Sequence, residues 1–348
     1  MIDKKYCMSH YLAFRYISDP NLNFLNDRGH QVYEPHSDVP PILCRTADDV
    51  GEALRRKIEE GFIPGKTALL LSGGIDSAIL ASYLPKGTKV YTFQSDMAGA
   101  IDETEQAAKY ARAYELDHEI IRVTWEDFET LTDEICRFQN VPVHSIEIMF
   151  YKAAMHARSQ GMESLMVGEG ADLNFGGMDK MLSRDWLLDD FISFYTFVDP
   201  AKVLKDPQDM RHVYERYRLD GDRIDFMRFM EEVYSIQSST SFMHPFCMAG
   251  VKHYSPYSFL AMAEPLDLER VRRGDSKYLL RELFAQRYPD IPVPNKIPMP
   301  RAMDQWLADW EGPSRPEFLP GCAKGMKGDQ KWLIWCLERY LNVMEQEH

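Results

Sequence analysis

The sequence predicts an α/β protein in which helices flank a parallel sheet, with a mostly helical C-terminal part. Residues 67–71 (TALLL) are almost wholly apolar, which is typical of a parallel strand buried on both faces. From this run to about residue 172, strand-like segments alternate with segments of helical periodicity, as in βαβ units. Beyond about residue 180 the chain is rich in Met, Phe and Tyr and shows no clear strand, so helices are expected there.

The elements are predicted in the following order. Residues 1–50 are rich in Asn, Asp, His and Pro and should form an irregular N-terminal extension. A first helix is expected to begin after an N-cap at Thr46 and to stop at Gly61. Further strands are expected at residues 89–95, 118–123 and 164–167, and further helices at residues 77–84, 102–116 and 146–161. We therefore divide the chain into residues 1–60, an α/β core over 61–200, and a helical part over 201–348 that completes the functional site.

Composition and charge weigh against several classes of protein. The chain has 348 residues, 45% of them hydrophobic, which is enough for a substantial buried core. Its formal charge of −14 makes the average surface repel phosphate backbones, so no nucleic-acid partner is expected. The N-terminus lacks a signal-peptide pattern and no run approaches the roughly 18 apolar residues of a membrane span, so we expect a cytoplasmic protein without a membrane partner. Six dispersed cysteines without a C-x-x-C pair suggest neither disulfides nor a zinc site.

The first motif, residues 72–77 (SGGIDS), lies where the first predicted strand enters a helix. Backbone N–H groups and a helix N-terminus surround one point there, and glycines allow a ligand close approach, so the turn resembles an anion site. Asp76 would repel a bare phosphate, so we expect a Mg²⁺ ion to bridge its carboxylate to phosphate oxygens. The alternative is a tight turn in which Asp76 and Ser77 cap the helix.

Residues 71–77 (LSGGIDS) resemble the pyrophosphate-binding loop of the N-type ATP pyrophosphatases, the PP-loop superfamily. The resemblance implies a Rossmann-like fold of the adenine nucleotide alpha hydrolase type. It also implies binding of ATP with Mg²⁺, attack on the α-phosphate, and release of AMP and pyrophosphate. The implied nucleotide-binding residues in this half of the chain are Leu71, Ser72, Gly73, Gly74, Asp76, Ser77 and Phe93.

The second motif, residues 168–177 (GEGADLNFGG), is similar to a loop of the asparagine synthetase family and, more distantly, of the β-lactam synthetases. The resemblance implies that Asp172 is the second Mg²⁺ carboxylate and that Gly168 and Gly170 contact the nucleotide. It implies that Glu169 helps an amine attack the acyl-adenylate. At the positions of the family's Glu-Leu pair this chain has Leu173 and Asn174, so the identity of its native substrate stays open. The alternative is a polar turn whose glycines serve packing.

A third segment, residues 272–300, resembles the family's Lys-x-Leu-Leu-Arg helix and the loop that follows it. The resemblance makes Lys277 and Lys296 candidates for neutralising the triphosphate, and it implies that Lys296 also stabilises the transition state. Two other groups receive structural interpretations. Asp102 and Glu103 are expected to be an N-cap and a first-turn acid, and the histidines, His253 among them, show no metal-ligand spacing and are expected in core or capping roles.

Together the motifs predict an AMP-forming ligase that adenylates a small carboxylate and captures it with ammonia or an amine. The glutaminase domain of the glutamine-dependent relatives begins with a cysteine, whereas residue 2 here is Ile2, so ammonia is expected to be free or to come from a separate glutaminase. A homo-oligomer is possible. Two alternatives stay open: an RNA-modifying PP-loop enzyme, and a non-catalytic nucleotide-binding regulator.

Overall fold

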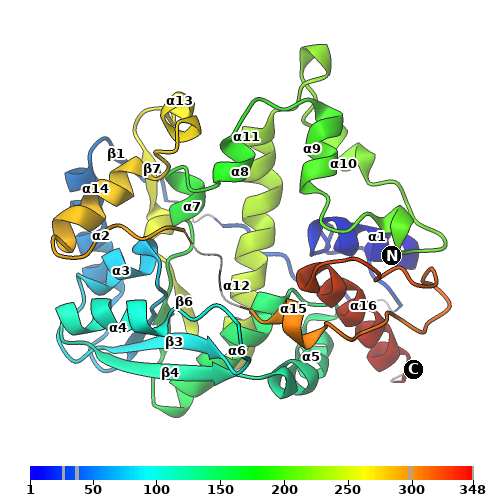
Figure 1. Cartoon of the computed structure of the whole chain (residues 1–348), viewed down its shortest axis with the longest axis horizontal. Coiled ribbons are helices and arrows are strands. Elements are labelled where there is room, and N and C mark those ends of the chain that lie inside the picture. The colour runs from blue at the N-terminus through cyan, green and yellow to red at the C-terminus, as the bar shows by residue number, and fades with distance from the viewer. Residues whose placement is uncertain (26–27, 36–38, 297–298, 300, 347–348) are drawn as a thin grey trace.

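A parallel sheet of five strands forms the centre of one half of the molecule (Figure 1). The computed structural model describes residues 1–25, 28–35, 39–296, 299 and 301–346. In space the strands follow the order β4, β3, β2, β5, β6, and every neighbouring pair is parallel. Their bounds are β2 Thr67–Leu70, β3 Lys89–Ser95, β4 Asp117–Val123, β5 Ser164–Met166 and β6 Lys252–Tyr254. The predicted α/β class is confirmed by this all-parallel order.

Helices cover both faces of this sheet. Leu69 and Val90 face one core cluster, whereas their neighbours Leu70 and Tyr91 face another, because successive strand residues point to opposite sides. The first cluster is closed by α2 Ala47–Gly61, α3 Ile75–Ala81, α4 Thr104–Ala113 and α14 Tyr278–Arg287. The second is closed by α5 Trp125–Gln139, α6 Ser145–Ser159, α12 Ser235–Ala249 and α16 Gly328–Gln346. Burial on both faces explains why residues 67–71 are almost wholly apolar.

A third core cluster is helical and lies at the far end of α12 from the sheet (Figure 1). It gathers the C-terminal end of α1 Lys4–Phe14 with α8 Asp179–Leu182, α9 Leu188–Tyr195, α10 Arg211–Glu215, α11 Phe226–Phe229 and α13 Leu268–Arg272. The remaining elements are short: β1 Ile42–Cys44, α7 Ala171–Asn174, β7 Leu260–Met262 and α15 Met303–Trp306, with 3₁₀ turns at Pro200–Lys202, Asp220–Asp222 and Pro256–Phe259. The expectation of a mostly helical C-terminal part is met by these elements.

Two expectations about the N-terminal and C-terminal thirds were wrong. The first 50 residues are not irregular throughout, because α1 is a helix whose residues 7–14 are all buried, and it contacts α16 at the other end of the chain. The region after residue 180 does contain strands, since β6 completes the main sheet and β7 pairs in parallel with β1. Both strands are only three residues long, too short for periodicity to show.

Several predicted elements agree closely with the structure. Helix α2 begins after Thr46, whose hydroxyl accepts the Asp49 N–H while the Asp49 carboxylate accepts the Thr46 N–H, and it ends at Gly61. Strand β3 covers residues 89–95 as predicted. Within the part of the chain that the structure describes, no helix is long and apolar enough to cross a membrane.

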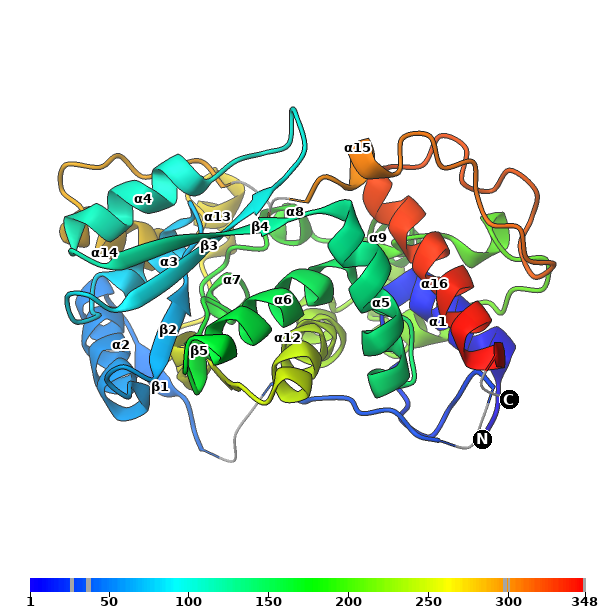
Figure 2. The same cartoon turned by 90° about the horizontal axis from the view of Figure 1, so that it is seen from below.

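Helices α6 and α12 lie side by side (Figure 2), and along the chain they lead to the amino ends of β5 and β6. Helix α12 follows α11 without a break, through a wider π-helical turn over Met230–Tyr234. Turns of this kind change the rotation of a helix and often occur at functional sites. The turn therefore sets which side chains of α12 point toward the sheet.

Candidate active site

The largest concentration of predicted site residues lies beyond the carboxyl ends of β2, β3 and β5. Strand β2 is the point at which the strand order changes direction, since β3 lies on one side of it and β5 on the other. Ligands of open parallel sheets bind in the crevice at such a switch point. A cavity of about 300 Å³ opens there, and its lining includes nine predicted residues: Leu71, Ser72, Asp76, Ser77, Phe93, Gly168, Glu169, Gly170 and Asp172.

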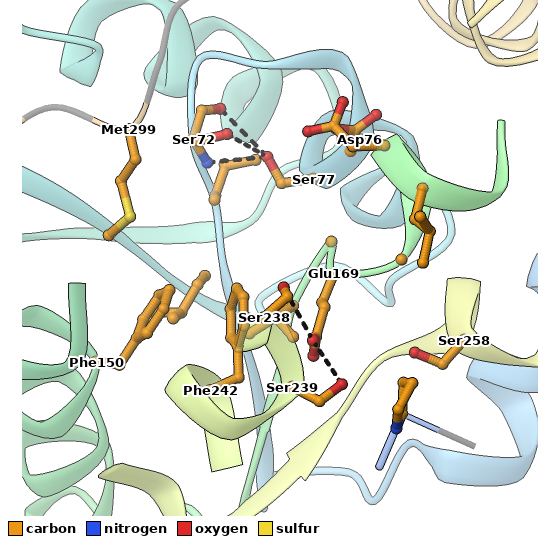
Figure 3. Close-up of a pocket in the computed structure, with 18 of the residues that line it drawn as sticks. Ser72, Asp76, Ser77, Phe150, Glu169, Ser238, Ser239, Phe242, Ser258 and Met299 are labelled. Carbon is orange, nitrogen blue, oxygen red and sulfur yellow. Dashed lines mark hydrogen bonds between the residues drawn. The ribbon is translucent and has the colours of Figure 1, made fainter. Parts of the chain in front are cut away.

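The turn between β2 and α3 is closed by its own serines (Figure 3). The Ser72 N–H donates to the Ser77 hydroxyl at 2.9 Å, the two hydroxyls lie 2.9 Å apart, and the Gly74 N–H donates to the Ser72 hydroxyl at 3.2 Å. Ser77 thus ties the start of α3 back to the end of the strand. Asp76 does not cap the helix: its Oδ1 is buried without a hydrogen-bond partner among the described residues, and its Oδ2 accepts from Lys277 at 2.6 Å.

Lys277 joins the two carboxylates that the motifs predicted to share a site. Its ammonium, on a side chain only 7% exposed, lies 2.6 Å from Asp76 Oδ2 and 2.6 Å from Asp172 Oδ1. Lys296 approaches from the exposed side, with its ammonium 2.8 Å from Asp172 Oδ1 and 2.7 Å from the Gly177 carbonyl oxygen. Two acids and two lysines from distant parts of the chain are therefore in direct contact.

The charges of this cluster determine its protonation. Burial would lower the pKa of Lys277, but the charges of Asp76 and Asp172 outweigh burial and raise it. Burial raises the pKa of Asp172, but Lys277 and Lys296 more than offset this and hold it below its usual range. Asp76 has a single close ammonium, so burial dominates and its pKa is raised. Lys277 is thus a charged group held between two acids.

Gly177 permits this close packing. A Cβ atom at this position would lie 2.0 Å from Asp172 Oδ1 and 2.1 Å from Lys277 Cε, so no side chain fits without displacing both. Gly170, two positions before Asp172, has φ +84, and a Cβ atom there would lie 3.3 Å from the Ser258 backbone nitrogen. The glycines of the second motif are therefore required by a left-handed turn at one position and by close approach at the other.

Glu169 is buried in the same cavity, on a side chain 8% exposed. Its Oε1 lies 3.2 Å from the Ser239 hydroxyl and 3.4 Å from the Ser238 hydroxyl, both of which donate from α12 (Figure 3). Its Oε2 lies 2.9 Å from His253 Nε2, a contact that is an ion pair when the imidazole carries a proton. The ring is not aligned for a hydrogen bond, since Nε2 has none among the described residues. His253 was expected in a core or capping role, and its place beside Glu169 was missed.

Glu103 is also closer to the site than its sequence position suggested. The Asp102 carboxylate accepts the Thr104 N–H at 2.8 Å, so Asp102 acts at the helix start as expected. Glu103 is the residue before the first turn rather than within it, and its side chain, 6% exposed, lines the cavity. Burial raises the pKa of Glu103 to about 7, with partial opposition from the Gly73 backbone. The expected role as a first-turn acid was therefore wrong.

The inner wall of the cavity consists of residues that no motif indicated. They are Tyr234 from the π-helical turn, Ser235, Ser238, Ser239 and Phe242 from α12, Phe150 from α6, and Met299. The spacing of the α12 residues places them on one helical face, a signal present in the sequence that could have been recognised. What this helical face contacts could not have been recognised, because the contact depends on how α12 packs against the sheet.

Two curated proteins are similar to this chain over part of their length. Amidase chry2 of Gibberella zeae is 28% identical over 160 residues, which are 39% of this chain and 24% of that protein. Amidase chyE of Penicillium rubens is 23% identical over 161 residues, again 39% of this chain and 24% of that protein. The chain thus spans about a quarter of the length of these relatives.

The solved structures that match this chain resemble it only weakly. They include the NH3-dependent NAD synthetase from Campylobacter jejuni, with TM-score 0.25 and 15% identity over 37% of this chain and 58% of that chain. They also include the U34-tRNA thiolase NcsA from Methanococcus maripaludis, with TM-score 0.29 and 13% identity over 86% of this chain and 79% of that chain. The strand order of this chain itself therefore defines its fold. The asparagine synthase profile, in contrast, matches residues 64–250, more than half of the chain, and so this protein belongs to the asparagine synthase family.

Proposed function

We propose that the protein is an ATP-dependent ligase that adenylates a substrate carboxylate, releases pyrophosphate, and transfers the acyl group to ammonia or an amine. The observation that carries this proposal is the arrangement of Asp76, Asp172 and Lys277 in direct contact, in the same cavity as a buried Glu169. Family membership supports ATP-dependent amide formation in general. The substrates and the order of steps are our proposal.

Asp76 and Asp172 are the residues that would hold Mg²⁺. Asp76 Oδ1 is a buried oxygen without a hydrogen-bond partner in the described part of the chain, as expected for a cation ligand, and Asp172 Oδ1 contacts the same ammonium as Asp76. The described residues contain no group of three or more His, Cys, Asp or Glu that could hold a metal. Two carboxylates fit Mg²⁺ nevertheless, because this ion is often bound by one or two carboxylates with substrate phosphates and water. When bound, it would neutralise phosphate charge.

Lys277 and Lys296 would take part in the same neutralisation. As the α-phosphorus is attacked, negative charge grows on the departing pyrophosphate, and fixed cations nearby stabilise that charge. Lys277 is buried and held by two acids, which suits a positioned cation. Lys296 is exposed on its side chain to 49% and extends from the loop at the cavity mouth, which suits a residue that moves onto the nucleotide. We assign Lys277 to positioning and Lys296 to the reacting phosphates.

Glu169 would accept the proton that the nitrogen loses when it attacks the acyl-adenylate. The carboxylate accepts hydrogen bonds from Ser238 and Ser239 and lies in contact with His253, so its orientation is set before a substrate arrives. The nitrogen would be free ammonia, ammonia from a separate glutaminase, or an amine. The names of the two fungal relatives, both amidases, are consistent with chemistry at an amide, although they match over a small part of their length.

An RNA-modifying PP-loop activity is less well supported. Such chemistry commonly uses reactive cysteines, which need a thiolate. Four of the six cysteines are buried, and burial raises the pKa of the Cys7 thiol to about 12 and that of Cys44 to about 11. These thiols are inert at neutral pH. The net charge of −14 argues in the same direction.

The proposal is tested by product analysis with ATP, Mg²⁺, ammonia and a panel of carboxylic acids. We expect AMP and pyrophosphate in equal amounts, and loss of both in Asp76→Asn. Asp179→Asn is the matched control, because Asp179 lies in the first turn of α8 just as Asp76 lies in the first turn of α3, but it is exposed. Formation of ADP and phosphate would contradict the proposal, as would full activity of Asp76→Asn.

A further inference from the structure

The charges that line the cavity restrict the acid that can enter it. Among the described residues, the lining contains four carboxylates, those of Asp76, Glu103, Glu169 and Asp172, and no lysine, arginine or histidine. The two nearest ammonium groups, of Lys277 and Lys296, are engaged at the nucleotide end by Asp76 and Asp172. His253 lies behind Glu169 rather than in the lining. Among the residues that the structure describes, the inner end of the cavity therefore offers no cation to an anionic substrate group.

Arg15 is a further cation that contacts α12, and it is also engaged elsewhere. Its guanidinium donates to Gln237 Oε1 at 2.9 Å and stacks over the Phe197 ring, 4.3 Å from the centroid. Gln237 is buried on a different side of α12 from the residues that line the cavity. A substrate carboxylate placed against the lining face of α12 would thus lose its hydration and gain no counter-charge, which is strongly unfavourable.

The same wall offers apolar and aromatic surface. The rings of Phe150 and Phe242 stack with centroids 4.4 Å apart and an interplanar angle of 29°, and together they form one side of the cavity (Figure 3). Tyr234 and Met299 extend this surface, and Leu173 adds to it where the family's loop carries an acid. The serine hydroxyls on the wall already have acceptors, because Ser238 and Ser239 donate to Glu169 and Ser235 donates to the Glu231 carbonyl oxygen.

We propose that the acyl substrate is a monocarboxylic acid with a neutral, largely apolar or aromatic body, and that aspartate is not the native substrate. The inference rests on the proposed function, since it describes the acid adenylated at that site. The single carboxylate is placed toward the nucleotide and Glu169, and the remainder of the acid lies against Phe150, Phe242 and Tyr234. A dicarboxylate is excluded, because the described lining holds no cation for its second carboxylate.

The test uses stable mimics of the acyl-adenylate, because these report the acyl pocket without requiring turnover. Acylsulfamoyl adenosines with phenylacetyl, hexanoyl, acetyl and aspartyl groups are titrated into the full chain by calorimetry. We expect the phenylacetyl and hexanoyl compounds to bind at least about tenfold more tightly than the aspartyl compound, because an unpaired buried charge is expensive. An aspartyl compound that binds as tightly as these two, or more tightly, overturns the inference.

A failure of the proposed function would give a different binding result from a failure of the substrate inference alone. If none of the four compounds binds more tightly than adenosine, the site does not recognise an acyl-adenylate and the proposed function fails together with the inference. If all bind and aspartyl is preferred, the proposed function stands and only the substrate class is wrong.

Variants of the aromatic wall give a second measurement. Phe242→Leu removes one ring of the stacked pair, and we expect it to weaken the phenylacetyl compound by about two- to tenfold while the acetyl compound changes little. Phe194→Leu is the matched control, because Phe194 forms a similar stacked pair with Trp186, at 4.5 Å and 28°, but outside the cavity. Equal affinities of Phe242→Leu and Phe194→Leu for the phenylacetyl compound would contradict the assignment of this wall. Melting temperatures of both variants check that they fold.

Discussion

The ammonium of Lys277 lies 2.6 Å from the Oδ2 atom of Asp76, although the two residues are 201 positions apart in the chain. The same ammonium lies 2.6 Å from Asp172 Oδ1, so one buried cation joins the strand-to-helix turn after β2, the loop after β5 and the start of α14. Lys277 reaches this position from a backbone with φ 52, a left-handed conformation that is uncommon for a residue with a side chain. The site is thus tied together by a residue that is itself held in an unusual conformation.

Replacement of Lys277 tests this linkage. Lys277→Met leaves two acids without their shared partner, and we expect it to lower the free energy of unfolding by about 1 to 3 kcal/mol, as when a buried charged hydrogen bond is broken. We further expect Mg²⁺ to raise the melting temperature of the variant more than that of the native protein, because two unpaired carboxylates attract a cation. Urea unfolding and thermal melting with and without Mg²⁺ measure both effects.

Lys296→Met is the comparison for this experiment. Lys296 pairs with only one of the two acids and its side chain is 49% exposed, so its removal should change stability little. A stability loss in Lys296→Met as large as in Lys277→Met would contradict the role given to the buried lysine.

The close packing at Gly177 makes a second prediction. Gly177→Ala places a methyl group where Asp172 Oδ1 and Lys277 Cε now lie, so both must move. We expect ATP-dependent pyrophosphate release to fall on the order of 100-fold, since displacements near 1 Å at a reacting centre have effects of this size. Gly29→Ala is the control, because its nearest neighbour would be Pro20 O at 3.4 Å, an ordinary contact. Near-native activity of Gly177→Ala would show that the cluster tolerates rearrangement.

The contact between His253 and Glu169 makes a third prediction. If the contact with His253 orients Glu169, then His253→Gln should slow amide formation on the order of tenfold, which corresponds to about 1.4 kcal/mol of transition-state stabilisation. Pyrophosphate release in the first half-reaction should stay close to native, because the nucleotide end of the cavity is unchanged. The two half-reactions are measured separately, the first by pyrophosphate exchange and the second by rapid mixing of preformed acyl-adenylate with the amine. Equal losses in both would indicate a purely structural role.

The parts of the site that lie within one loop could be predicted from the sequence. Asp76 and Asp172 each follow a buried apolar strand, and the ends of parallel strands meet at one edge of a sheet. The α/β class followed from the same strands, because burial on both faces removes polar residues from them. The local sequence was sufficient to predict a site residue wherever the turn that holds it directly follows a recognisable strand.

The parts that depend on distant packing and that no motif marks could not be predicted. Helix α1 is buried nearly all round between the helical cluster and α16, so its sequence has no polar face and no helical periodicity. Strand β6 has three residues and is a strand only because β5 lies beside it. His253 is the middle residue of β6. Its position beside Glu169 could not be predicted because the strand itself could not be predicted.

Glu103 makes the last prediction, which concerns the pH dependence of stability. Burial raises the pKa of Glu103 from 4.5 to about 7. Below about pH 4.5 the carboxyl is protonated in both the folded and the unfolded chain, and it has no effect. Between 4.5 and 7 the unfolded chain loses this proton while the folded chain keeps it, so folding becomes less favourable as the pH rises. Above pH 7 the whole penalty, of about 3 kcal/mol, is present.

Glu103→Gln removes this titration while it keeps the size of the side chain. We therefore expect the variant to be more stable than the native protein at pH 8, and the difference to shrink as the pH falls to 4.5. Urea unfolding at several pH values between these limits measures it. Glu105→Gln is the control on the same helix, because the Glu105 side chain is 87% exposed and should show no such trend. Parallel curves for Glu103→Gln and the native protein would mean that Glu103 ionises in the folded state as freely as in water, and that the cavity reaches its carboxylate with solvent.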